Sequence, residues 1–266
     1  MNARDQITAG IGWREHPGDG PVLVALHGIG SEARAFDALA AHLPGWRVIA
    51  CEAPGYGPSA PLPMDWPVAA DYAAALLPWL DALDLPRAHL LGHSLGTLIG
   101  AAFARAYPGR VDTLTLASCA QGGGIAPGAM LPTAQAARID ELTRLGAEAF
   151  AQARAPRLIH QPEANPDLVA AVAAGMAKVR MPGYGQAVRM LASGDLATDC
   201  AELRVPSAVI VGAEDLVTPP AQSQRAHSAL PAEIRGALTL VPGCGHAIHQ
   251  QAAAALAAAI HSGVSP

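Results

Sequence analysis

The sequence predicts an α/β fold with a mostly parallel, doubly wound sheet and one helical insertion. Short apolar runs recur along the chain, separated by amphipathic segments of helical length, which is the alternation that parallel sheets require. Each run is nearly continuous in apolar residues, as expected for strands covered by helices on both faces. The alternation stops between residues 119 and 202, where no good strand candidate occurs.

The expected elements follow in order along the chain. Residues 6–14 are expected to form an antiparallel edge hairpin that turns at Gly10. Parallel strands are expected at Val22–Leu26, Arg47–Ala50, Ala88–Leu91, Val111–Leu116, Ser207–Val211 and Ala237–Val241. Amphipathic or apolar helices are expected between them at Ala35–His42, Val68–Leu83 and Leu95–Tyr107.

The chain is expected to form one core with an insertion, because single cores stop growing near ~250 to 300 residues and this chain has 266. Residues 1–118 and 203–266 are assigned to the core. Residues 119–202, after the sixth strand, are assigned to a helical lid rich in Ala and Arg. Open α/β sheets bind ligands at the carboxyl ends of their strands, so the lid is expected to cover that edge.

Composition excludes several classes of protein. The chain is 51% apolar and 15% charged with a net charge of -5, which excludes a disordered, collagenous or disulfide-stapled protein. No polybasic run offers a surface to nucleic acid, and no apolar run approaches the ~20 residues of a membrane span. The N-terminus lacks the apolar stretch of a signal peptide, so a cytoplasmic location is expected. Monomer and homodimer both remain open.

The motif Gly92-His93-Ser94-Leu95-Gly96 carries the strongest chemical signal. It follows an expected strand and opens an expected helix, which is the context in which G-x-S-x-G presents a nucleophilic serine above a sheet. Only glycine fits on either side of so sharp a turn. The helix N-terminus favours the negative charge that develops during attack. We therefore predict that Ser94 is the nucleophile.

A serine hydroxyl needs a base, and the base needs a third group to orient it. Asp215 is the predicted acid, because Gly212-Ala213-Glu214-Asp215 follows an expected strand; the neighbouring Glu214 is the alternative. His246, in Pro242-Gly243-Cys244-Gly245-His246, is the predicted base, and His249 is its competitor. Of these two, His246 opens the last helix after a glycine, whereas His249 lies one turn further on.

Backbone amides are expected to bind the developing oxyanion. The loop His27-Gly28-Ile29-Gly30 ends the strand Val22–Leu26, and the predicted donors are the amides of Ile29 and of Leu95, which follows the nucleophile. His27 is interpreted as a packing residue and Ser59 as a turn residue.

No metal or cofactor is expected. The sequence has no H-E-x-x-H, P-loop or dinucleotide fingerprint, and no C-x-x-C pair. The four cysteines are expected to be reduced thiols rather than disulfides or a structural zinc site; they are Cys51, Cys119, Cys200 and Cys244. A thiol nucleophile at Cys244 is disfavoured, because the strand-to-helix turn carries serine.

Together these motifs resemble the α/β-hydrolase fold superfamily, in its group of small, lidded, cofactor-independent esterases, enol-lactonases and carbon-carbon hydrolases. The resemblance covers nearly the whole chain outside the lid and includes Glu52–Ser59. Two departures are Glu52, where the family usually has Asp, and Thr97, where it usually has a small residue. The resemblance implies the α/β-hydrolase fold and a Ser94–His246–Asp215 triad that acts on a small-molecule acyl substrate.

The sequence is compatible with three functions. The leading hypothesis is a serine hydrolase that cleaves a carboxylic ester or lactone through an acyl-enzyme. The first alternative is carbon-carbon bond hydrolysis in a dioxo acid, although members that do this often carry Asn where His93 stands. The second alternative is a ligand-binding homologue without turnover, which the complete triad disfavours.

The lid is expected to set the substrate. Met130, Met176, Met181, Tyr184 and Met190 are candidates for an apolar pocket or for ordinary lid core. Six arginines are candidates to bind a substrate carboxylate, and the sequence singles out none of them: Arg138, Arg144, Arg154, Arg157, Arg180 and Arg189.

Overall fold

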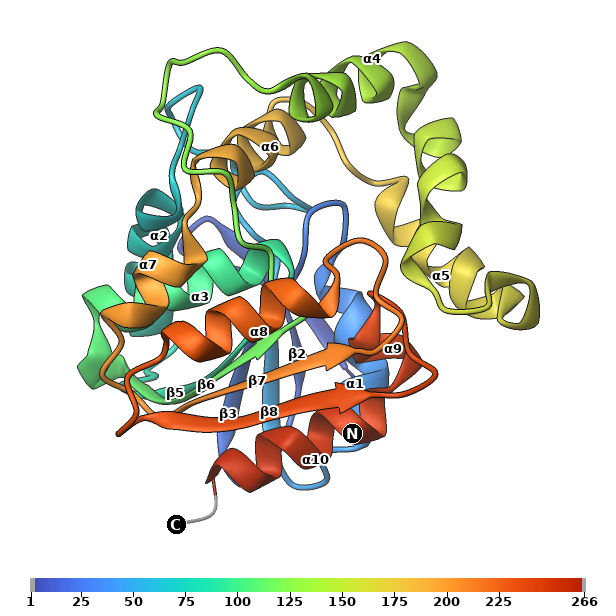
Figure 1. Ribbon diagram of the computed structural model, residues 1–266. Coiled ribbons are helices and arrows are strands. Elements are labelled where there is room, and N and C mark those ends of the chain that lie inside the picture. The colour runs from blue at the N-terminus through green and yellow to red at the C-terminus, as the bar shows by residue number, and fades with distance from the viewer. Residues whose placement is uncertain (1–2, 265–266) are drawn as a thin grey trace.

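The computed structural model describes residues 3–264 and contains an eight-stranded sheet with helices on both faces (Figure 1). The strand order is β1-β2-β4-β3-β5-β6-β7-β8. The hairpin predicted around Gly10 is present: β1 (Arg4–Thr8) pairs antiparallel with β2 (Ile11–His16) at one edge. Gly10 has a φ of 77°, which a residue with a side chain rarely adopts.

The six predicted parallel strands are all present, and their observed ends lie within two residues of the predicted ones. They are β3 (Val22–Leu26), β4 (Arg47–Cys51), β5 (Ala88–His93), β6 (Val111–Ala117), β7 (Ser207–Gly212) and β8 (Arg235–Val241). The inner strands β3 to β7 are largely buried, because helices cover both of their faces. This architecture is the α/β-hydrolase fold.

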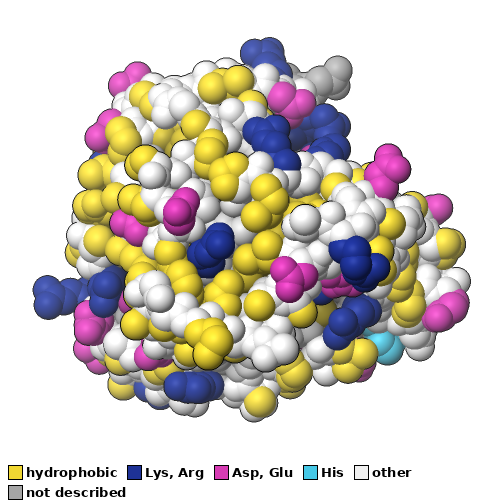
Figure 2. Space-filling view, turned by 90° about the horizontal axis from the view of Figure 1, so that it is seen from above, with side chains coloured by type: hydrophobic (Ala, Val, Ile, Leu, Met, Phe, Trp, Pro, Cys, Tyr) yellow, Lys and Arg dark blue, Asp and Glu magenta, His cyan; other side chains and the backbone are white. Residues whose placement is uncertain are grey.

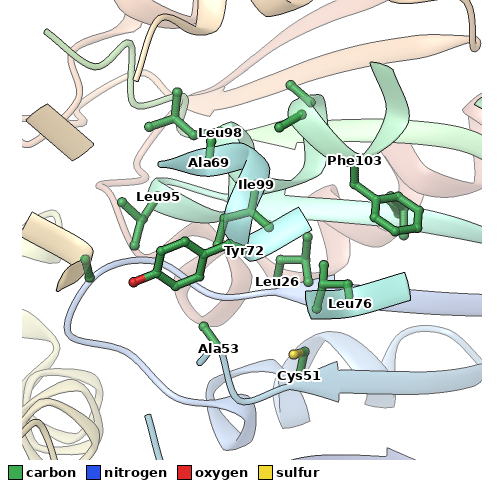
Figure 3. Packing of buried hydrophobic residues seen from close by; sticks show 14 of the residues in the cluster. Leu26, Cys51, Ala53, Ala69, Tyr72, Leu76, Leu95, Leu98, Ile99 and Phe103 are labelled. Carbon is green, nitrogen blue, oxygen red and sulfur yellow. The ribbon is translucent and has the colours of Figure 1, made fainter. Parts of the chain in front are cut away.

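Helices on one face of the sheet enclose the larger core. They are α2 (Ala69–Ala82), α3 (Leu95–Ala106), α7 (Leu196–Ala201) and α8 (Pro220–Ala229). Figure 3 shows side chains of α2 and α3 packed over strand residues Leu26 and Cys51, with Tyr72 and Phe103 among the largest. Asp71 helps to start α2 by accepting a hydrogen bond from the amide of Val68, so this helix begins where the sequence predicted.

The opposite face carries a smaller core. It is covered by a 3-10 turn, η1 (Ala33–Phe36), by α1 (Asp37–Ala41), by α9 (Ile248–Gln251) and by α10 (Ala253–Val264). The helical segment predicted at Ala35–His42 is present, divided between the 3-10 turn η1 and the short helix α1.

Helices also fill the segment between β6 and β7, and the described residues there contain no strand. The segment holds α4 (Thr133–Arg154), the 3-10 turns η3 (Ala155–Leu158) and η4 (Pro162–Ala164), α5 (Pro166–Met176), α6 (Gly183–Ser193) and α7. Figure 1 shows α4, α5 and α6 above the carboxyl edge of the sheet, whereas α7 lies beside α3 and α8. We call residues 119–195, which precede α7, the helical insertion.

The chain reverses its direction of travel across the sheet between β3 and β5. From β3 it moves outward to β4, and it then crosses back to β5 on the other side of β3. Leu26, at the end of β3, pairs with Gly92, near the end of β5. Loops that follow such neighbouring strands part from each other and leave a crevice at the carboxyl edge. The fold therefore brings the loop after β3 beside the predicted nucleophile.

The molecular surface seen from above the insertion carries no concentrated charge. In Figure 2, basic and acidic side chains are scattered among hydrophobic and neutral ones over this face. Within residues 3–264, no helix is both long enough and apolar enough to cross a membrane.

Candidate active site

Ser94 occupies the strained turn that its motif predicts. It joins β5 to α3 with a φ of 51° and a ψ of −114°, a region that residues with side chains rarely visit. Its amide donates to the carbonyl of Ala117 on the neighbouring strand, and Thr97 donates its hydroxyl to the carbonyl of Ser94. These hydrogen bonds hold a backbone conformation that would otherwise relax.

The two glycines of the motif are required by close backbone approaches. A Cβ at Gly92 would lie 2.4 Å from the carbonyl oxygen of Gly96, and a Cβ at Gly96 would lie 2.1 Å from the carbonyl oxygen of Leu26. Both distances are far below van der Waals contact with backbone that has no room to move. The G-x-S-x-G pattern therefore follows from the geometry of the turn.

Asp215 and His246 form a buried pair. Asp215 follows β7, and its Oδ2 accepts a hydrogen bond of 2.9 Å from Nδ1 of His246, which follows β8. Oδ1 of Asp215 accepts from the amides of Val217 and Thr218. Burial alone would raise the pKa of Asp215, but the hydrogen bonds with His246 and Thr218 outweigh it and hold that pKa below its usual value. Asp215 is therefore ionised at neutral pH, and Nδ1 of His246 carries the proton.

Thr218 contacts both members of this pair, although the sequence analysis gave it no role. Its hydroxyl lies 2.9 Å from Oδ2 of Asp215, 3.1 Å from Nδ1 of His246 and 3.0 Å from the carbonyl of Ser118. A threonine three residues after an aspartate is a common local hydrogen-bonding pattern, and this spacing was the available signal.

The alternatives to the predicted acid and base lie elsewhere. Glu214 accepts a hydrogen bond from the amide of Cys244 and makes none to a histidine. His249 is buried against the rings of Phe36 and His93, and neither of its ring nitrogens has a hydrogen-bond partner among the described residues. Of the two candidate acids, Asp215 is therefore the one that hydrogen-bonds to His246. His249 has no acid as a hydrogen-bond partner among the described residues.

The loop after β3 lies directly beside Ser94. A Cβ at Gly28 would lie 3.0 Å from the Cβ of Ser94, so a side chain here would press against the nucleophile turn. Gly30 donates its amide to the hydroxyl of Tyr56, which anchors the far end of the loop. The amides of Ile29 and Leu95 donate to no other described group. Leu95 is the first residue of α3, where amides lack partners within the helix.

His27 holds this loop from beneath, as a packing residue. Its Nδ1 donates to the carbonyl of Gly28, and its Nε2 accepts from the amide of Ala53. Burial lowers the pKa of His27 to about 4, so the ring is neutral. Glu52 lies alongside, with one oxygen 3.7 Å from Nε2 of His27 and the other accepting from the amide of Ala33.

Ser59 is also structural, as predicted. Its hydroxyl donates to the carbonyl of Glu52 and accepts from the amide of Gly12 on β2. All four cysteines are buried free thiols. Within residues 3–264, no group of three or more His, Cys, Asp or Glu side chains is placed to hold a metal ion.

The loop that carries His246 is fixed from two sides. Nε2 of His93 donates to the carbonyl of His246, and burial lowers the pKa of His93 to about 3, so this ring stays neutral. From the helical insertion, Leu158 accepts a hydrogen bond from the amide of Ala247. Gln251 completes the contact: its Oε1 accepts from the amides of Gly245 and His160, and its Nε2 donates to the carbonyl of His160.

Ser94 and His246 line the same cavity, which has a volume of about 330 Å³. Its floor includes Ile29 and Gly30, and its far wall comes from the helical insertion with Arg138, Phe150, Arg154, Arg157, Met176 and Tyr184. A second cavity of about 370 Å³ shares Ile29, Gly30 and His246 with the first and extends toward α1 and α5. A small organic molecule in the first cavity would therefore meet Ser94, His246 and Ile29 together.

Comparisons with known proteins agree with this fold. Residues 20–252 match the family of serine aminopeptidases S33. A protein of Pseudomonas savastanoi pv. phaseolicola named "Putative carbamate hydrolase RutD" is 30% identical over 240 residues, which cover 86% of this chain and 88% of that one. A pimeloyl-[acyl-carrier protein] methyl ester esterase of Neisseria meningitidis is 30% identical over 217 residues, or 77% of this chain and 65% of that one.

Solved structures share the fold at lower identity. The enol-lactonase from Burkholderia xenovorans superposes with a TM-score of 0.84 at 22% identity, covering 99% of this chain and 100% of that one. A thermophilic esterase from Thermogutta terrifontis superposes with a TM-score of 0.81 at 22% identity, covering 98% and 97%. Since the family match spans most of the chain, the protein belongs to the serine aminopeptidase S33 family and is an α/β-hydrolase enzyme.

Proposed function

We propose that this protein hydrolyses a small carboxylic ester or lactone through an acyl-enzyme formed on Ser94. One observation carries the proposal: the hydrogen bond between Asp215 and Nδ1 of His246 reserves Nε2 for the serine, and Ser94 and His246 line one cavity. Esterase and enol-lactonase names among the similar proteins support the substrate class.

Acylation begins when Oγ of Ser94 attacks the carbonyl carbon and Nε2 of His246 takes the hydroxyl proton. The carbonyl oxygen becomes an oxyanion and accepts hydrogen bonds from the amides of Ile29 and Leu95, which donate to no other described group. The ionised carboxylate of Asp215 stabilises the imidazolium. The carbon–oxygen bond of the leaving group then breaks, and His246 returns the proton to that oxygen.

Deacylation repeats these roles with water as the nucleophile. His246 takes a proton from the water, the hydroxide adds to the acyl carbon, and the bond to Oγ of Ser94 breaks with return of the proton to Oγ. In a lactone the leaving alcohol stays part of the acyl chain, so one product leaves instead of two.

The helical insertion acts as a lid in this proposal. It supplies the far wall of the cavity and is tied to the His246 loop through Leu158 and Gln251. We also place the enzyme in the cytoplasm, since four buried free thiols suit a reducing compartment. Its substrate is a small acyl compound that fits a cavity of about 330 Å³.

The test is a substrate panel with two serine variants. Short p-nitrophenyl esters, simple lactones and a 2-hydroxy-6-oxo-dienoic acid are offered to the wild type, to Ser94→Ala and to a control, Ser31→Ala, whose hydroxyl does not line the cavity of Ser94. Turnover of esters or lactones is expected in the wild type and in Ser31→Ala, together with labelling by a fluorophosphonate probe, and neither is expected in Ser94→Ala. Full turnover by Ser94→Ala refutes the assignment, and exclusive cleavage of the dienoic acid refutes the ester or lactone class.

A further inference from the structure

Arginines concentrate in the cavity that contains Ser94. Three of the six arginines considered from the sequence, Arg138, Arg154 and Arg157, line it, and all three come from α4 or the turn that follows it. The remaining three, among them Arg144 on the same helix, do not line this cavity. The fold therefore places only these three of the six arginines in the cavity that contains Ser94.

Arg138 lies in this cavity without a partner. It donates no hydrogen bond and forms no ion pair to any residue between positions 3 and 264, and its Nη1 is shielded from solvent. Burial lowers its pKa, as expected for a cation removed from water without a compensating anion. An unpaired guanidinium with five donors is costly to bury, so a group that supplies acceptors and negative charge would be bound strongly.

The groups that surround Arg138 supply no such charge. Its electrostatic neighbours are the hydroxyls of Tyr56 and Tyr184 and the guanidiniums of Arg154 and Arg157. Glu141 pairs with Arg154, which also lies over the ring of Phe150. The cavity wall therefore holds two guanidinium groups, those of Arg138 and Arg157, without an acidic partner among the described residues.

We propose that Arg138 binds a carboxylate on the acyl part of the substrate, so that the preferred substrates are half-esters of small dicarboxylic acids or lactones that carry a carboxylate. This inference rests on the proposed function for its catalytic step. A guanidinium presents two parallel donors that match a carboxylate, and the hydroxyl of Tyr184 in the same wall offers a third. Arg154 and Arg157 add attraction without direct contact.

The catalytic test uses matched esters that differ only in charge. Monomethyl esters of succinic, glutaric, adipic and pimelic acids are compared with the same esters whose free acid is replaced by a primary amide, which has the same shape and no charge. The variants are Arg138→Met and the control Arg144→Met, on the same helix but outside the cavity. We expect the wild type to prefer the charged ester at its best chain length by about 10- to 100-fold in kcat/KM.

Arg138→Met is expected to abolish that preference by losing activity on the charged ester while changing the amide ester by less than about threefold. Arg138→Lys is expected to restore part of it, and Arg144→Met to resemble the wild type. The melting temperature of Arg138→Met should equal or exceed that of the wild type, because the substitution removes an unpaired, partly buried charge. A preference that survives in Arg138→Met overturns the inference, as does an equal loss on both esters.

A binding measurement separates this inference from the proposed function. Ser94→Ala is titrated with adipate or glutarate by calorimetry, and the double variant Ser94→Ala/Arg138→Met is titrated in parallel. Binding that needs Arg138 supports the carboxylate site even if no ester is turned over, in which case only the proposed function fails. Ester turnover without charge preference, and without Arg138-dependent binding of the diacid, overturns the inference and leaves the proposed function intact.

Discussion

Replacing Thr218 by valine tests how Asp215 and His246 are held. Valine keeps the shape of threonine and removes a hydroxyl that lies within 3.1 Å of both members of the pair. Its single proton reaches either Oδ2 of Asp215 or the carbonyl of Ser118, so only part of its hydrogen-bonding energy acts on the carboxylate. The backbone amides of Val217 and Thr218 remain on Oδ1 in the variant.

The magnitude follows from these contacts. A hydrogen bond to a charged group contributes about 1.5–3 kcal/mol, and the lower end applies because two amide donors remain and the hydroxyl proton is shared. About 1.5 kcal/mol corresponds to a loss of roughly 10-fold in kcat/KM. The free energy of unfolding should fall by about 1–3 kcal/mol as well, because the buried carbonyl of Ser118 loses its donor.

The assay compares Thr218→Val with Thr218→Ser on one ester, together with urea unfolding of both. Serine retains the hydroxyl, so its kcat/KM should stay within about threefold of the wild type, since RT ln 3 is well below one hydrogen bond to a charged group. If Thr218→Val keeps wild-type kcat/KM while its stability falls, the hydroxyl serves folding alone and its assignment to the Asp215–His246 pair is wrong.

Three further outcomes are expected. Burial raises the pKa of Glu52 to about 7, so between about pH 4.5 and 7 the folded protein keeps a proton that the unfolded chain has lost, and stability falls as pH rises through this window. Glu52→Gln should therefore melt above the wild type at pH 8 and with it at pH 4, and an equal difference at both pH values contradicts this. Gly96→Ala should fail to fold or lose activity, because its Cβ would lie 2.1 Å from a backbone oxygen of β3, whereas Gly100→Ala on the same helix meets only a leucine methyl at 3.3 Å; the measurement is thermal unfolding, and equal tolerance at the two positions would be inconsistent with the steric cause. Gln251→Leu should raise KM and lower the melting temperature by releasing the helical insertion from the His246 loop, and unchanged values for both would show that these hydrogen bonds do not position the loop.

Much of the core was predictable because its signals are local. Continuous apolar runs located the parallel strands to within two residues, since a strand buried on both faces has little room for polar side chains. Gly92, Ser94 and Gly96 gave the sharp turn, because no other residues fit the backbone approaches found there. The helical segment predicted over Ala35–His42 is present as a 3-10 turn followed by a short α-helix, a division that the sequence pattern did not reveal because so short a helix depends on tertiary contacts for its form.

The residues of the candidate site could be predicted only in part from local sequence signals. The prediction of Asp215 over Glu214, and of His246 over His249, rested on position in the loop, whereas the hydrogen bond between Asp215 and His246 links residues 31 positions apart. Thr218 was missed because its partners come from three separate loops after the strands.

The sequence by itself determined the order of strands and helices, the nucleophile turn and the residue types available for acid, base and oxyanion donors, since each of these depends on side-chain size and backbone conformation over a few residues. Tertiary structure alone decided which arginines of the insertion line the cavity of Ser94 without an acidic partner among the described residues, and which hydroxyl joins Asp215. Those properties depend on burial and on distances between segments far apart in the chain. The sequence of a helix does not distinguish an arginine that faces water from one that faces an enclosed cavity.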